Sequence, residues 1–237
     1  MNKEGSAELA RETGHQPATI QEMVDIATWL QRKGIWVPRI SAVDYKNQII
    51  EFEPGGKTQS AFNRSLIDLE YTLVGLHGTE RNECIQKIKA KQKILAGRLA
   101  KIFRMIGRVQ AAGVIHGHPH FGNIVFRGNQ VGLVDFKLAE RINWNALFSK
   151  SAGKPPTDEI IALRIVNAFT PDYHYLSRII KPLNWGIYRP KWTKAEIKKM
   201  VGRLVQHYPC SNRIKELVAT HILEGWFAEE IRAADHN

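Results

Sequence analysis

The side chains best suited to chemistry lie in one stretch of the chain, residues 113–137. Its first half is a polar loop with four side chains that can accept protons or bind metals: His116, His118, His120 and Asn123. Two short apolar runs, 124–126 and 131–134, follow with a Gly-Asn turn between them, and the second run leads into Asp135. This pattern predicts a β-hairpin that brings Asn123 and Asp135 to adjacent strand ends. An amide oxygen and a carboxylate placed together suit Mg²⁺ and, through it, phosphate chemistry.

This layout resembles the catalytic core of the protein-kinase-like superfamily, in particular its atypical branch. His116-Gly117, where most kinases have His-Arg, is similar to aminoglycoside phosphotransferases and to the small kinase of the tRNA-modifying KEOPS complex. Residues 118–123 resemble the Asp-Pro-His-x-Gly-Asn loop of ubiquinone-biosynthesis atypical kinases. Upstream, residues 34–40 and 49–53 resemble the helix-to-strand turn and the hinge strand of the KEOPS-type kinase. The resemblance covers residues 20 to 168 and is most specific in the central loop.

The resemblance assigns expected roles to five side chains. Asn123 and Asp135 are expected to hold Mg²⁺ against the phosphates of ATP, and Asp135 is also a catalytic candidate. Lys137 stands where the family has Gly, so its cation could repel Mg²⁺ or could partly replace a strand lysine. Glu51 and Glu53, on the hinge-like strand, are expected to line the nucleotide site.

His118 is the main departure from the family, because it stands where a kinase has the aspartate that accepts the substrate's proton. A neutral imidazole can accept a proton, but it is bulkier and loses that capacity when protonated. Loss of a positioned base typically costs about 10²–10⁴-fold in rate. The chain also shows no Gly-rich phosphate loop and no strand lysine before its first helix. We therefore expect weak binding of ATP and Mg²⁺ and inefficient phosphotransfer, with His118 as the catalytic candidate beside Asp135.

Four functional hypotheses follow from these residues. The first is a degenerate kinase-like protein, a pseudokinase, that acts mainly by binding a partner. The second is an active atypical ATP-dependent phosphotransferase, and the third is a nucleic-acid-binding module on a kinase-derived scaffold. The fourth is a metal-dependent hydrolase, because alternate histidines on an extended segment can converge on Zn²⁺. Pro119 and the non-extended form of a kinase loop argue against this zinc site.

The expected fold class is α+β: a protein-kinase-like fold with a mostly helical large lobe and a reduced small lobe of one helix and two strands. Residues 1–18 lack periodicity and are expected to form a flexible arm. Residues 19–54 would form the remnant small lobe. Residues 55–237 would form the helical large lobe with a C-terminal helical extension. The 18 residues before the first helix are too few for the three strands that would complete a small lobe.

Helix and turn signals place the elements around the polar loop. Thr19 and Glu22 fit a capping box, which predicts a helix from Thr19 to Gly34 and gives Glu22 a structural role. Strands are expected near 38–44 and 47–53, with Pro54-Gly-Gly as a hinge. Further helices are predicted over 65–76, 83–111, 158–168, 194–207 and 212–232. Asp158 resembles the aspartate that holds the loop's backbone in kinases, although an acid in a first helical turn has a simpler explanation.

The formal charge of +11 is concentrated in two segments. Residues 81–108 carry nine Lys or Arg against one acid, and residues 178–203 carry eight against one. Such density favours a polyanionic partner, either nucleic acid or an acidic protein, although a basic surface that aids solubility is equally compatible. Neither a signal-peptide pattern nor an apolar run of membrane-spanning length is present, so no membrane partner is expected and a cytoplasmic location is the default.

Overall fold

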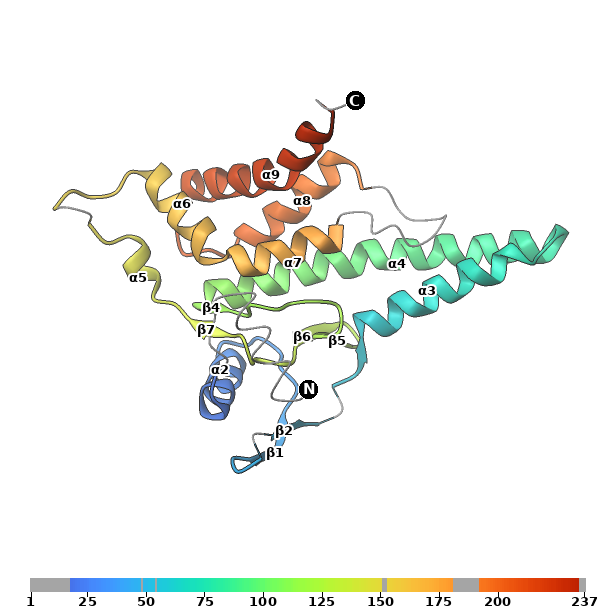
Figure 1. Ribbon diagram of the computed structural model, residues 1–237, viewed down its shortest axis with the longest axis horizontal. Coiled ribbons are helices and arrows are strands. Elements are labelled where there is room, and N and C mark those ends of the chain that lie inside the picture. The colour runs from blue at the N-terminus through green and yellow to red at the C-terminus, as the bar shows by residue number, and fades with distance from the viewer. Residues whose placement is uncertain (1–17, 48, 54, 151–152, 181–191, 235–237) are drawn as a thin grey trace.

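The computed structural model describes residues 18–47, 49–53, 55–150, 153–180 and 192–234. Its fold class is α+β, as predicted: helices predominate and three small antiparallel sheets join them (Figure 1). The expected N-terminal arm, residue 18 apart, and the hinge residue Pro54 lie outside the described residues, as does most of 178–191.

The first described helix, α2 (Ile20–Arg32), begins where its capping box predicts. The Thr19 hydroxyl accepts from the Glu22 amide, and the Glu22 carboxylate accepts from the Thr19 amide. Its buried face is apolar: Ile20, Met23, Ile26, Ala27 and Leu30. Two antiparallel strands follow, β1 (Ile40–Asp44) and β2 (Ile49–Phe52). The order of helix and two strands therefore agrees with the sequence pattern, and Glu22 has the structural role expected of it.

A second sheet has the order β3-β5-β6, with β3 (Lys57–Thr58) at its edge. Strands β5 (Ile124–Arg127) and β6 (Gln130–Leu133) form the predicted hairpin. The sequence pattern did not indicate β3, which pairs with β5 because Gly56 allows close approach. Gly56 has φ 107°, and an added Cβ there would overlap the Phe126 carbonyl oxygen.

Helices α3 (Gln59–Val74) and α4 (Gly78–Ala111) form a long helical hairpin that projects from the body (Figure 1). Both start earlier than predicted; α3 begins at Gln59 because the Thr58 hydroxyl caps it by accepting from the Ala61 amide. A small apolar cluster joins the projecting parts: Leu66, Leu73, Cys84 and Ile88.

The main core forms around the other end of α4. Its buried face contains residues that the 3.6-residue periodicity predicts: Leu99, Ile102, Phe103, Ile106 and Val109. Helix α8 (Lys194–Val205) crosses α4 at Gly107. A Cβ added to Gly107 would overlap the Leu204 carbonyl oxygen, so the two backbones can approach this closely only at a glycine.

Four more helices and one small sheet complete the body. The helices are α5 (Trp144–Leu147), α6 (Asp158–Ala168), α7 (Thr170–Ile180) and α9 (Asn212–Ala234). The sheet pairs β4 (Val114–Ile115) with β7 (Glu140–Arg141). The sequence pattern did not indicate α5, α7 or β7. In the described part of the chain, no helix has both the length and the apolarity needed to cross a bilayer.

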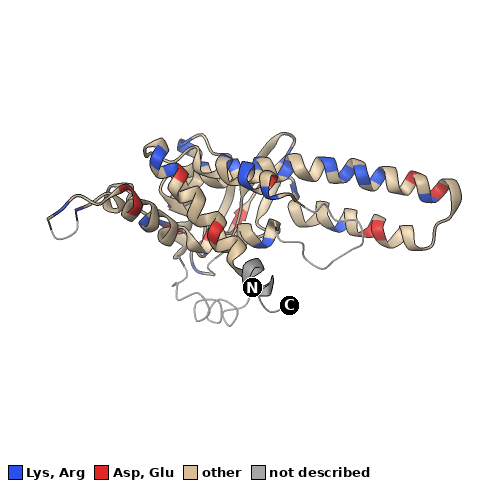
Figure 2. Ribbon diagram, turned by 90° about the horizontal axis from the view of Figure 1, so that it is seen from above, with Lys and Arg blue, Asp and Glu red and all other residues tan. Residues whose placement is uncertain are grey.

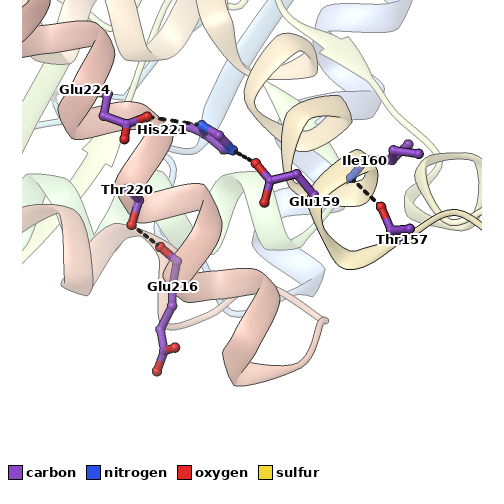
Figure 3. A network of polar contacts seen from close by, with 7 residues as sticks. All are labelled: Thr157, Glu159, Ile160, Glu216, Thr220, His221 and Glu224. Carbon is purple, nitrogen blue, oxygen red and sulfur yellow. Dashed lines mark hydrogen bonds and ion pairs between the residues drawn. The ribbon is translucent and has the colours of Figure 1, made fainter.

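Helices α6 and α9 pack side by side and are joined by a polar network (Figure 3). His221 Nε2 on α9 lies 2.7 Å from Glu159 Oε1 on α6, and His221 Nδ1 lies 3.4 Å from Glu224 Oε2. The network therefore ties the C-terminal helix to the helix that precedes α7.

Candidate functional site: the polar loop and the strand ends

The β5–β6 register brings Asn123 and Asp135 to the same end of the hairpin. Ile124 pairs with Leu133, and the Val134 amide donates to the Asn123 carbonyl at 3.0 Å. Asn123 therefore directly precedes β5, and Asp135 follows two residues after the end of β6. The adjacency predicted from the two apolar runs is confirmed.

Asp135 has an unusual backbone conformation. Its φ is 62°, and it is the only non-glycine residue in the described part of the chain with a positive φ. Aspartate adopts this left-handed region more readily than most residues, but the conformation costs free energy and persists only where the surroundings enforce it. Here the next residue, Phe136, is buried, and its ring packs edge-on against the His116 ring with the two ring centroids 5.3 Å apart. The packing of Phe136 thus fixes the direction in which Asp135 leaves the hairpin.

Asn123 is buried and is held by the polar loop, which we define as residues 116–123. Its backbone amide donates to the His120 carbonyl at 2.9 Å, and its side-chain Nδ2 donates to the His118 carbonyl at 3.1 Å. This arrangement uses the NH₂ group of the side chain and leaves the carbonyl oxygen Oδ1 as the atom that can bind a cation. Asn123 and Asp135 together offer an amide oxygen and a carboxylate, which fits a Mg²⁺ or Mn²⁺ ion.

His116 is a neutral anchor of the loop. It is fully buried, and its Nε2 lies 3.1 Å from the Val134 carbonyl oxygen, while the His118 amide donates to its Nδ1. These partners require the tautomer with the proton on Nε2. Burial lowers the pKa of His116 to about 4, against smaller opposing effects of the hydrogen bond to the Val134 carbonyl and of the charge on Asp135. His116 therefore joins the polar loop to the strand end that carries Asp135.

His118 and His120 are half-buried beside each other. Their ring centroids are 4.3 Å apart, and the His118 ring also contacts Tyr175 edge-on at 4.7 Å. Burial lowers the pKa of both histidines, although the charge on Asp135 opposes this effect. Both imidazoles are therefore neutral at pH 7, and His118 is in the protonation state that a general base needs.

The three histidines of the loop do not converge. His116 is directed at Val134, and the His118 and His120 rings contact each other edge-on. Within the described ranges, no group of three or more His, Cys, Asp or Glu side chains is arranged to hold a metal ion. The geometry therefore gives no support to the zinc hydrolase hypothesis.

Asp172, on α7, holds the backbone of the polar loop and was not among the residues predicted from the sequence. Its Oδ1 accepts from the Gly117 amide at 2.8 Å, and its Oδ2 accepts from the His116 amide at 3.4 Å. Of the two interpretations left open for Asp158, the structure shows the first-turn acid, because Asp158 is exposed in the first turn of α6 and does not hold the loop. The available signal was an acid flanked by the apolar and aromatic residues of 169–176.

A buried chain of polar side chains continues from Asp172. Gln110 on α4 donates from Nε2 to Asp172 Oδ2 at 3.0 Å, and its Oε1 accepts from the Tyr208 hydroxyl. The Tyr208 and Tyr173 hydroxyls lie 2.7 Å apart. Burial raises the pKa of Asp172 to about 6, so its carboxylate is ionised at neutral pH and can accept all three hydrogen bonds. The polar loop is thereby linked to α4, α7 and the residues that follow α8.

Gly117 is required by the geometry of the loop. It has φ 77°, and a Cβ at this position would overlap the Leu138 carbonyl oxygen. The loop and the segment after Asp135 therefore pass closer together than the arginine of an ordinary His-Arg pair would permit. This contact explains in physical terms why the sequence reads His-Gly.

The other predicted site residues are not joined to this centre by any described interaction. Lys137 is half-buried close to Asp135 in sequence, and its carbonyl oxygen accepts from the Ala18 amide at 2.6 Å. Glu51 and Glu53 are exposed on and just after β2. The Glu53 carboxylate lies 3.8 Å from the Arg39 guanidinium, at an exposed site where an ion pair contributes little. The described interactions link Asn123 and the histidines to the strand end that carries Asp135, and none of them reaches the two glutamates.

Comparison with known proteins gives one distant relative. No family model matches the chain. The chain is 28% identical over 107 residues to the KEOPS complex subunit Bud32 of Pyrococcus abyssi, and the match covers 45% of this chain and 38% of that protein. This similarity supports a kinase-like scaffold.

Proposed function

We propose that this chain is a degenerate kinase-like protein that holds a nucleotide and a divalent cation weakly and acts mainly by binding a partner. The observation that carries the proposal is the strand-end pair of Asn123 and Asp135, held beside a loop in which His118 replaces the catalytic aspartate. In this proposal, residues 19–54 serve as a reduced small lobe and residues 55–237 as the large lobe.

The strand-end pair supports metal and nucleotide binding for two reasons. Its oxygen ligands suit Mg²⁺, and the left-handed backbone at Asp135 is the kind of strained conformation that collects at functional sites. The surrounding loop is also rigidly held, since Asp172 and His116 each fix it through buried hydrogen bonds. A preorganised pair of this kind can bind a cation that is already carried by the phosphates of ATP.

The same surroundings favour weak transfer. The imidazole of His118 stands where a kinase has a compact carboxylate. Its ring is packed against His120 and Tyr175. Lys137 lies two residues after Asp135, where its positive charge would compete with a cation for the carboxylate. We therefore assign partner binding as the main role. The name of the distant relative, a subunit of a complex, supports a protein partner.

Thermal unfolding with nucleotide tests the metal site. ATP with Mg²⁺ or Mn²⁺ should raise the Tm of the wild type, and Asp135→Ala should abolish that increase. Asp158→Ala is the matched control, because it removes an exposed aspartate that contacts no part of the loop, and it should retain the increase. An equal increase in Asp135→Ala and the wild type would contradict the proposal.

A second candidate function is an active atypical phosphotransferase with His118 as its base. The specific observation in its favour is that His118 is half-buried and neutral at pH 7, next to the strand end that carries Asp135. The two candidates differ in one property, which is the rate of phosphotransfer by the wild type.

A further inference from the structure

One side of α4 carries exposed cations, of which only Arg108 has a hydrogen-bond partner among the described residues: its Nη2 donates to the Gly34 carbonyl at 2.8 Å. Four exposed side chains form this surface, which we call the α4 basic face: Lys89, Lys93, Arg104 and Arg108. Their spacings of 4, 11 and 4 residues keep them within about 100° of the helix circumference and spread them over about 28 Å. Figure 2 shows Lys and Arg along α4 from the body out onto the projecting hairpin, whereas α3 alongside carries few.

Among the described residues, no acid forms an ion pair with the α4 basic face. No ion pair between described residues involves a Lys or Arg of α4 or α8. On the side of α4 that faces α3, by contrast, the cations have structural partners: Lys91 Nζ lies 2.7 Å from Ser65 Oγ, and Arg98 donates to Gln59 Oε1 at 3.1 Å. Lys89, Lys93 and Arg104 have no hydrogen-bond partner among the described residues.

The positive surface continues onto the turn between α8 and α9. His207 lies in this turn, and its pKa is lowered first by burial and then by the charges of Arg108, Arg104 and Lys215. Lys215 Nζ donates to the Gln206 carbonyl at 3.1 Å, which places its ammonium beside the same turn. At its inner end the α4 basic face therefore meets a further cation from α9.

The composition of the face distinguishes between possible partners. Protein interfaces rely on large apolar and aromatic anchors in a buried centre. Between the cations, α4 has small residues at 90, 96, 97 and 100, and Ile94 is the one large apolar side chain strongly exposed among its residues. Repeated isolated cations along a straight rod instead match the regularly spaced charges of a phosphodiester backbone.

We infer that the α4 basic face binds a nucleic acid through its phosphate backbone. This inference goes beyond the proposed function, because it uses neither Asn123 nor Asp135. The binding energy arises from release of the counterions condensed on the nucleic acid when the lysines and arginines replace them. Because the contacts are to phosphates, binding depends strongly on salt and weakly on base sequence.

Fluorescence anisotropy with the full chain tests the inference. The probes are a labelled 20-base-pair DNA duplex of mixed sequence and the matching single strand. With about five phosphate contacts, affinity for the duplex should fall by a factor on the order of 10²–10³ between 50 and 200 mM salt. The triple variant Lys89→Gln, Lys93→Gln, Arg104→Gln should bind at least about 10-fold more weakly at 50 mM salt, and its log–log salt slope should be smaller by about 2.7.

A charge-matched control separates the face from net charge alone. Lys46→Gln, Lys57→Gln, Lys150→Gln removes three exposed cations elsewhere, so both triple variants carry +11 − 3 = +8. The control should bind like the wild type. All six side chains are exposed and lack described side-chain partners, so each variant should retain the wild-type Tm. Equal weakening in the two variants, absence of duplex and single-strand binding at 50 mM salt, or tighter binding to a poly-glutamate peptide than to either nucleic acid would overturn the inference.

Discussion

Asp172 is the residue on which the geometry of the polar loop depends most. It accepts hydrogen bonds from two backbone amides of the loop and from Gln110, all in a buried environment. Local patterns in the sequence did not assign it to the loop, because its contacts with the loop span 55 and 56 residues. Asn123 and Asp135, in contrast, were predictable, since a short hairpin register alone brings them together.

Replacement of Asp172 by asparagine should destabilise the protein. The new NH₂ group would face N–H groups that now donate to the carboxylate. A buried N–H group would therefore lose its hydrogen-bond acceptor. We expect Asp172→Asn to lower the free energy of unfolding by about 2–3 kcal/mol, measured by urea denaturation. Asp158→Asn, at an exposed helix start, should cost less than about 1 kcal/mol. Equal costs in the two variants would contradict the role of Asp172.

His116 and Asp172 should make opposite contributions to acid stability. The pKa of His116 is about 4 in the folded protein and near 6.5 when unfolded, so the unfolded state binds more protons between these values and stability falls as the pH drops through this range. The pKa of Asp172 is raised from 3.8 to about 6, so the folded state binds the extra proton there and stability rises as the pH drops.

The variant His116→Gln isolates the contribution of the histidine. Glutamine carries its Nε2 at about the same reach as the histidine Nε2, so it can still donate to the Val134 carbonyl, but it does not titrate. Between pH 7 and 4.5, the wild type should lose about 2–3 kcal/mol more stability than the variant. Only the wild type has an imidazole that is protonated in the unfolded state and neutral in the folded state over this range. Urea denaturation at both pH values measures the difference. Parallel pH profiles for the two proteins would show that His116 is not held neutral.

At the scale of elements, the crossing of α4 and α8 fixes how the C-terminal helices pack on the body. Local signals were sufficient for α2, whose capping box marks its start, and for the buried face of α4. They were insufficient for β3, because this strand depends on the approach of Gly56 to Phe126 across the chain. They also missed α7, whose start contains Pro171, a residue tolerated in the first turn of a helix.

Two glycines of α4 provide a matched test of the crossing. Gly107→Ala would place a Cβ against the Leu204 backbone, so α8 must shift, and we expect a loss of about 1–3 kcal/mol. Gly97→Ala, on the same helix with open space around it, should instead stabilise the protein by up to about 1 kcal/mol. Thermal or urea unfolding would reveal the opposite signs, and stabilisation by both substitutions would contradict the close crossing.

At the scale of the whole molecule, the chain combines a rigidly held strand-end pair with a projecting, positively charged hairpin. The charge clusters were visible in the sequence, but which cations are free could not be predicted. Lys91 and Arg98 belong to the same basic segment as Lys89 and Lys93, yet they bind α3 and stabilise the hairpin. Tertiary packing, and not composition, separates these roles.

The most direct test of the proposed function is a single-turnover assay with radiolabelled ATP, comparing the wild type with His118→Ala and His118→Asp from pH 5.5 to 8.5. A degenerate kinase-like protein should show little phosphotransfer, and His118→Asp should restore the family's loop without restoring activity, because Lys137 would still compete with the cation for Asp135. Robust transfer by the wild type that His118→Ala lowers by about 10²-fold or more would contradict the proposal and establish His118 as a catalytic base.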